Sequence, residues 1–165
     1  MAELTNLEVK LAEVIGLAMA AQGATDKVRK LVEEKGDDEL ARTLQKMHDE
    51  ARETEERSTD VAGSLDGKKT AILEKARETK QEATEMMETY LGDDADALDG
   101  FEFLTMAEAG EVGHWQIVGV LADRGGTDDV RALAAWAAPI QQRHLDQALQ
   151  GSLRLPEAED PNATE

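Results

Sequence analysis

The chain has 165 residues, with 36 Asp and Glu against 18 Lys and Arg, so its formal net charge at pH 7 is −18. It contains no cysteine, which excludes disulfides, a cysteine nucleophile and thiolate metal sites. The negative charge argues against binding to nucleic acids or to anionic membrane surfaces, both of which require clustered basic side chains. No apolar run approaches the roughly 20 residues of a membrane span, and no basic segment precedes the first apolar stretch. We therefore expect a soluble, cytoplasmic protein.

Abundant Ala, Leu, Glu, Lys, Gln and Arg, with only 3% aromatic residues, predict helix almost throughout. Glycines and prolines divide the chain. Gly23 is expected to break or bend the first helix, and Pro139 to kink the last one. The expected helices, in chain order, are residues 2–22 with a continuation to 35, 37–62, 68–91, 101–123 and 127–153. The acidic segment 92–100 does not fit the calcium-loop template and is expected to cap a helix.

Long helices joined by short turns must pack side by side, which predicts an all-α fold: an antiparallel four-helix bundle with an additional helix. Residues 1–153 form the predicted bundle, and residues 154–165 an acidic flexible tail. The third helix is expected to turn one apolar stripe inward, made of Ile72, Leu73, Ala76, Ala83, Met86, Met87 and Tyr90.

The fourth helix holds a pattern that could carry chemistry. Glu111 and His114 form Glu-x-x-His, and Glu108 stands one turn earlier. Residues three apart share a helix face, so this carboxylate and imidazole could reach one cation. Apolar residues bracket the motif, and a carboxylate buried there unpaired is costly. A metal, a cationic partner or a proton must therefore compensate.

A second half-site lies in the fifth helix, where Gln141-x-x-His144 falls on the apolar stripe. Di-metal sites in helical bundles use one Glu from each of two helices and Glu-x-x-His from each of the other two. Candidate single donors are Glu13 in the first helix and Glu50, Glu53 or Glu56 in the second, of which Glu53 and Glu56 lie one turn apart.

The predicted metal ligands are accordingly Glu111, His114, Glu108, Glu53, Glu56, Glu13, Gln141 and His144. Because only oxygen and imidazole ligands are present, the expected metal is iron, as a single ion or a di-iron pair, or manganese. His48 has polar neighbours and is expected to be solvated, whereas Trp115 and Trp136 are expected to pack in the core or at a subunit contact.

Two segments carry a resemblance to a known family. The run Glu108, Glu111, Val112 and Trp115 before the Gly125-Gly126 turn, together with Glu53-Thr54 and Glu56, is similar to the ferritin-like superfamily. The nearest branch is that of the YciE/YciF-type bacterial stress proteins, with rubrerythrin more distant. The resemblance implies a bundle with a di-iron or similar site and a role in oxidative or general stress response.

The chain departs from that pattern where Gln141-Gln142 replaces an expected Glu, and where Glu56 or Arg57 replaces an expected His or Gln. A lost carboxylate weakens a di-iron centre. The alternative is therefore a non-catalytic, stress-associated scaffold or binding bundle with a degenerate, metal-free site. A third hypothesis is a module whose acidic surface binds a basic partner. A homodimer that pairs through a helix face is also expected.

Overall fold

The computed structural model describes residues 2–164, which are helical over most of their length and contain no strand. The all-α prediction is confirmed. The elements are α1 (Asn6–Lys35), α2 (Asp38–Ser64), α3 (Lys69–Tyr90), α4 (Ala97–Gly125), α5 (Asp128–Arg154) and a final 3₁₀ turn, η1 (Leu155–Ala158). No helix within the described range is both long enough and apolar enough to cross a bilayer.

The predicted break at Gly23 is wrong, because α1 runs through it without interruption. Gly23 is exposed, and one glycine inside a helix costs only about 1 kcal/mol relative to alanine. Buried residues on both sides, from Leu11 to Val32, hold the helix against its neighbours and outweigh that cost. The predicted stop at Gly36 is confirmed, with this glycine in the left-handed conformation at φ 78°.

The acidic loop before α4 caps that helix, as its sequence predicts. The Asp96 side chain accepts hydrogen bonds from the backbone N–H groups of Leu98 and Asp99, and the Asp99 side chain accepts one from the Asp96 N–H in return. These bonds satisfy donors that the first helical turn leaves free. The helix therefore begins at Ala97, four residues earlier than the sequence predicts.

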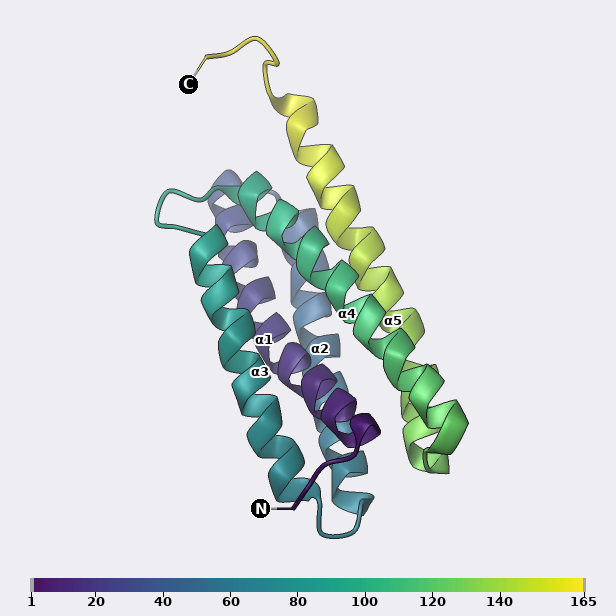
Figure 1. Cartoon of the computed structure of the whole chain (residues 1–165). Helices are drawn as coiled ribbons and strands as arrows, with labels where there is room; N and C mark the ends of the chain where they lie inside the picture. The colour runs from purple at the N-terminus through teal and green to yellow at the C-terminus, as the bar shows by residue number, and fades with distance from the viewer. Residues whose placement is uncertain (1, 165) are drawn as a thin grey trace.

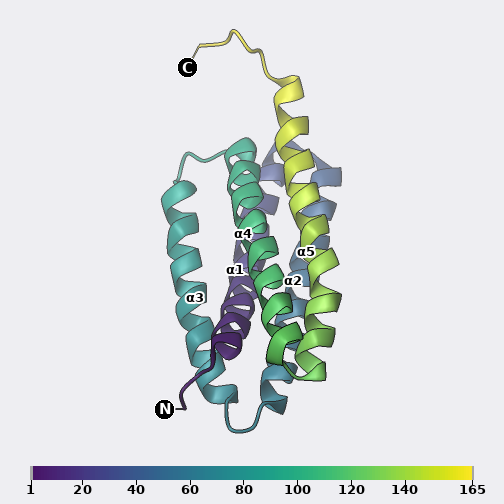
Figure 2. The ribbon, with the colours of Figure 1, turned by 45° about the vertical axis from the view of Figure 1, so that its right-hand side comes forward.

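Four helices form the bundle, in the spatial order α1, α2, α5 and α4, and each runs antiparallel to its two neighbours (Figures 1 and 2). α3 lies outside this ring along α1 and carries the chain back from the end of α2 to the start of α4 (Figure 1). α3 and α4 touch each other only sparsely: α3 packs mainly on α1, whereas α4 packs mainly on α5 and to a lesser extent on α1.

This position of α3 corrects part of the predicted stripe. Ile72 and Ala76 are fully buried, but Met86 and Tyr90 are 54% and 60% exposed. A helix that packs mainly on one neighbour buries a narrow face, so the far end of the stripe reaches solvent. The Tyr90 ring keeps one aromatic neighbour, Phe103, with 6.0 Å between the ring centroids.

Two apolar clusters fill the two ends of the bundle, and polar side chains lie between them. One, near the α4–α5 turn, includes Leu11, Ile15 and Trp115. The other, near the opposite end, includes Val28, Leu44, Met47, Phe101 and Leu104. Between these clusters along α2, α4 and α5 lies a set of polar side chains that we call the central polar layer: Glu50, Glu108, Gln141, Arg143 and His144.

The two tryptophans occupy different environments. Trp115 is fully buried in the cluster near the α4–α5 turn. Trp136 is partly buried at the contact between α5 and α2, where the Arg57 guanidinium carbon lies 4.3 Å from the centre of its ring. This cation–π contact bridges α2 and α5 at the edge of the bundle.

Candidate functional site

The central polar layer is organised around His144, whose imidazole lies between two carboxyl groups. Its Nε2 is 2.7 Å from Glu50 Oε2 on α2, and its Nδ1 is 3.8 Å from Glu108 Oε2 on α4. Because the Glu50 carboxylate can only accept, Nε2 carries the proton of this hydrogen bond. The histidine thus joins three helices of the ring.

Two further side chains complete the layer. The Arg143 guanidinium donates to both Glu50 oxygens at 2.8 Å, and the Gln141 amide donates to Glu108 Oε2. Glu108, Gln141 and His144 are each at most 5% exposed. Each therefore relies on these contacts for the hydrogen bonds that water would otherwise supply.

The surroundings of the two carboxyl groups in the layer shift their pKa values in opposite directions. Burial by itself would raise the pKa of Glu50, but the hydrogen bonds from His144 and Arg143 outweigh it and hold that pKa below its usual value. Burial raises the pKa of Glu108 to about 8, against a weaker opposing effect of the Gln141 hydrogen bond. Burial lowers the pKa of His144. At neutral pH the layer therefore holds one charged pair, Glu50 with Arg143, beside a protonated Glu108.

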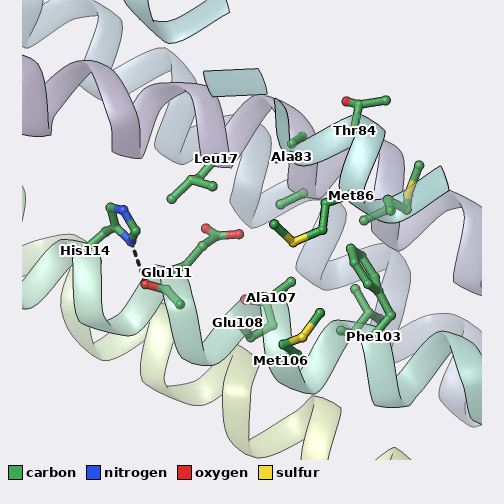
Figure 3. Close-up of a pocket in the computed structure, with 16 residues that line it drawn as sticks. Leu17, Ala83, Thr84, Met86, Phe103, Met106, Ala107, Glu108, Glu111 and His114 are labelled. Carbon is green, nitrogen blue, oxygen red and sulfur yellow. Dashed lines mark hydrogen bonds between the residues drawn. The ribbon is translucent and has the colours of Figure 1, made fainter. Parts of the chain in front are cut away.

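Glu111 faces a different space from Glu108. It is 6% exposed, and its carboxyl group points into a groove between α1, α3 and α4, toward Leu17 and Met86, while Glu108 turns toward α5 (Figure 3). Burial and the neighbouring Glu108 raise the pKa of Glu111 well above its usual value. The two carboxyl groups, predicted to share one helix face, therefore lie in two different environments.

His114 does not join Glu111 at a common point. Its Nδ1 donates to the carbonyl of Gly110 at 2.8 Å (Figure 3), and its Nε2 lies 3.5 Å from Glu13 Oε2. Glu13 in turn pairs with Lys10 at 2.7 Å. These three side chains are partly exposed at the edge of the bundle, so Glu13 does not reach the central polar layer.

The structure also corrects the choice of glutamates on α2. Glu53 and Glu56 are exposed, and Glu53 pairs on the surface with Arg57 at 2.7 Å. The inward glutamate is Glu50, a candidate single donor that is not among the predicted ligands. One signal favours it: Glu50 lies between Met47 and Thr54 on the buried stripe of α2.

The predicted metal ligands are not assembled as a metal site. Among the described residues no three His, Asp or Glu side chains converge on a point that an ion could occupy. Glu50 and Glu108 contact opposite nitrogens of one imidazole, so one ion cannot meet all three groups. The Arg143 guanidinium already neutralises Glu50 and would repel a cation. The arrangement does not fit a di-metal centre.

The central polar layer should contribute measurably to stability. We expect Glu50→Gln to lower the free energy of unfolding by about 2 kcal/mol, because it removes the charge that Arg143 and the buried His144 both contact. The matched control is Glu53→Gln, whose surface pair with Arg57 is worth at most about 1 kcal/mol. Urea unfolding measures both, and equal losses would contradict a special role for Glu50.

The chain was compared with protein-family models, with curated proteins and with solved structures. No family model, curated protein or solved structure matches it. The resemblance to the ferritin-like superfamily therefore stays a prediction.

Proposed function

We propose that this chain is a ferritin-like bundle that acts by binding a small apolar molecule in the groove between α1, α3 and α4, and that it does so without a di-metal centre. The observation that carries the proposal is the groove itself, a cavity of about 210 Å³. Apart from Glu108, Glu111, His114 and Thr84, its side chains are apolar or are glycine.

The shape of the groove follows from the residues that α1 supplies. Its floor on that helix is Leu17 followed by the small side chains of Ala20, Ala21 and Ala24. The walls come from α3 and α4, which touch each other only sparsely, and are formed by Ala83, Met86, Met87, Phe103, Leu104, Met106 and Ala107. Methionines adapt to ligands of different shape, which suits a binding site.

The volume sets the size of the occupant. An engineered apolar cavity of about 150 Å³ is large enough to bind benzene, whereas drug-sized ligands occupy pockets of about 300–1,000 Å³. A groove of about 210 Å³ therefore suits a ligand slightly larger than benzene, such as a short aliphatic chain.

The topology supports the ferritin-like part of the proposal. Ferritin-like bundles join two antiparallel helix pairs by one long crossover connection. Here α1–α2 and α4–α5 are the pairs, and α3 takes the place of the crossover (Figures 1 and 2). A role in stress response, a homodimer and a cytoplasmic location stay predictions, and iron or manganese binding is the competing hypothesis.

The binding test uses n-octanol, a neutral probe of suitable size, in calorimetric titrations. We expect saturable binding to the unaltered chain and at least a tenfold loss, about 1.4 kcal/mol, in Ala107→Phe, whose ring would occupy the groove. Ala20→Phe, in the floor of the groove on α1, should weaken binding in the same way. The matched control is Ala109→Phe, two residues along on the exposed side of α4. Binding that is absent, or that Ala107→Phe and Ala20→Phe leave unchanged, would overturn the proposal.

Elemental analysis tests the competing metal hypothesis. Protein purified without chelator should carry well below one metal ion per chain, and the content should be the same after Glu108→Ala with His144→Ala. Stoichiometric iron or manganese that this double variant loses would instead establish a metal site, and would require His144 and Arg143 to leave the contacts described above.

A further inference from the structure

The Glu111 carboxyl group is the unpaired polar group of the groove. Its side chain is more than nine-tenths buried, and within residues 2–164 it has no hydrogen-bond partner. It points into the cavity rather than into the helix interface behind it (Figure 3). Buried polar groups in folded proteins nearly always have a partner, because leaving one unpaired costs about 1–3 kcal/mol.

Among residues 2–164, no side chain near Glu111 is free to serve as that partner. The Gln141 amide already donates to Glu108, and His114 donates to the carbonyl of Gly110. α1 and α3 contribute no basic residue to the described lining of the groove, and the polar side chain that α3 contributes is the hydroxyl of Thr84. That hydroxyl donates to the carbonyl of Lys80 at 2.8 Å. A partner for Glu111 is therefore supplied by what fills the groove, either water or a ligand.

We propose that the groove binds an alkylammonium, an aliphatic chain that ends in a protonated amine, with its nitrogen on Glu111 and its chain along the walls of the groove. This inference rests on the proposed function and names the chemical class of the ligand. The apolar lining suits the chain, and the carboxyl group at the side of the cavity suits the amine. Burial keeps the Glu111 carboxyl group protonated when no cation is near it, and a bound ammonium would favour its ionised form. The resulting charge-assisted hydrogen bond is about twice as strong as a neutral one.

The surrounding charges favour a cation over other head groups. Glu108 on the same helix is protonated at neutral pH, so the negative charge near the groove comes from Glu13 on α1 and from the chain as a whole, which carries a net charge of −18. The one imidazole at the groove, His114, is turned toward Glu13. A carboxylate ligand would be repelled here, whereas an alcohol would gain only a neutral hydrogen bond.

The experiment compares three probes of equal chain length, octylammonium, n-octanol and octanoate, by calorimetric titration at about 0.15 M salt, where distant surface charges are screened. We expect octylammonium to bind at least tenfold more tightly than n-octanol, and octanoate to bind more weakly than both. In Glu111→Gln, which keeps the size of the side chain, the preference for octylammonium should disappear while n-octanol still binds.

The matched control is Glu102→Gln, an exposed carboxylate on the same helix, which should keep the full preference. If n-octanol binds but octylammonium is no tighter, or if Glu111→Gln keeps the preference, this inference is overturned and the proposed function stands. A preference lost equally in Glu102→Gln would show general attraction to an acidic surface and would also overturn it. If neither probe binds, both proposals fail.

Discussion

Replacing Gly16 by alanine is expected to lower the free energy of unfolding by about 3 kcal/mol, the upper part of the range for overpacked cores. An alanine Cβ at this position would overlap the carbonyl oxygen of Ala76 and lie 2.7 Å from Thr79 Cβ, both on α3. A backbone oxygen cannot rotate aside as a side chain can, so α3 itself would have to move away from α1. Urea unfolding, followed by circular dichroism, measures the loss.

The control for this prediction is Gly23→Ala in the same helix, where an added Cβ meets no atom within 4 Å. This change should stabilise the chain by about 0.5–1 kcal/mol, because alanine is the better helix former. Because α3 forms one wall of the groove, Gly16→Ala should also weaken n-octanol binding, whereas Gly23→Ala should not. If both variants change stability equally, the close approach of α1 and α3 is not as described.

Stability is expected to fall as the pH rises from about 6.5 to about 8. Burial raises the pKa of Glu108 to about 8 and that of Glu111 well above its usual value. Both groups are ionised in the unfolded chain throughout this window, so the folded chain binds more protons and loses stability as the pH rises. The slope is about 1.4 kcal/mol per pH unit for each carboxyl group that is still protonated in the folded state.

Two other groups act in the opposite direction at lower pH. The pKa values of His144 and Glu50 are lowered by folding, so each contributes stability that is lost as the pH falls below its unfolded pKa. Those windows lie below about 6.5 for His144 and about 4.5 for Glu50. Above pH 6.5, the pH dependence of stability therefore reports on the two buried carboxyl groups, Glu108 and Glu111.

Urea unfolding at pH 6.5, 7, 7.5 and 8 measures this dependence. Glu108→Gln combined with Glu111→Gln should flatten the curve, since amides do not titrate. The matched control is the double variant Glu53→Gln with Glu56→Gln, at two exposed positions. Its free energy of unfolding should depend on pH as that of the unaltered chain does. Stability that rises with pH over this range would mean that the two carboxyl groups are ionised in the folded chain.

The helices and their caps follow from local chemistry, which is why the sequence predicts them well. The Asp96 cap and the Gly36 stop depend on residues within one turn, and the buried face of α5 follows from the spacing of Gln141 and His144. The burial of Glu108 and Glu111 is likewise predicted by the apolar stripe around them.

The arrangement within the candidate site could not be predicted in the same way. The spacing of residues in a helix gives the direction of a side chain about the helix axis, but not which neighbouring helix that side chain contacts. The role of Glu50 depends on its contact with His144, which is 94 positions away in the sequence and which local spacing does not indicate. The separate surroundings of Glu108 and Glu111 depend on α3 leaning on α1, and no periodicity within a single helix specifies that choice of neighbour.

The two tryptophans should report on different parts of the molecule by fluorescence, because Trp136 stacks against Arg57 at the edge of the bundle and Trp115 does not. Trp115 lies in a dry core and should emit at short wavelength, whereas Trp136 lies partly in water beneath a guanidinium group at the contact of α2 with α5. In Trp136→Phe the remaining emission comes from the core alone. Comparing this emission with that of the unaltered chain distinguishes two events without any attached dye. One is the separation of α2 and α5, and the other is the unfolding of the whole bundle.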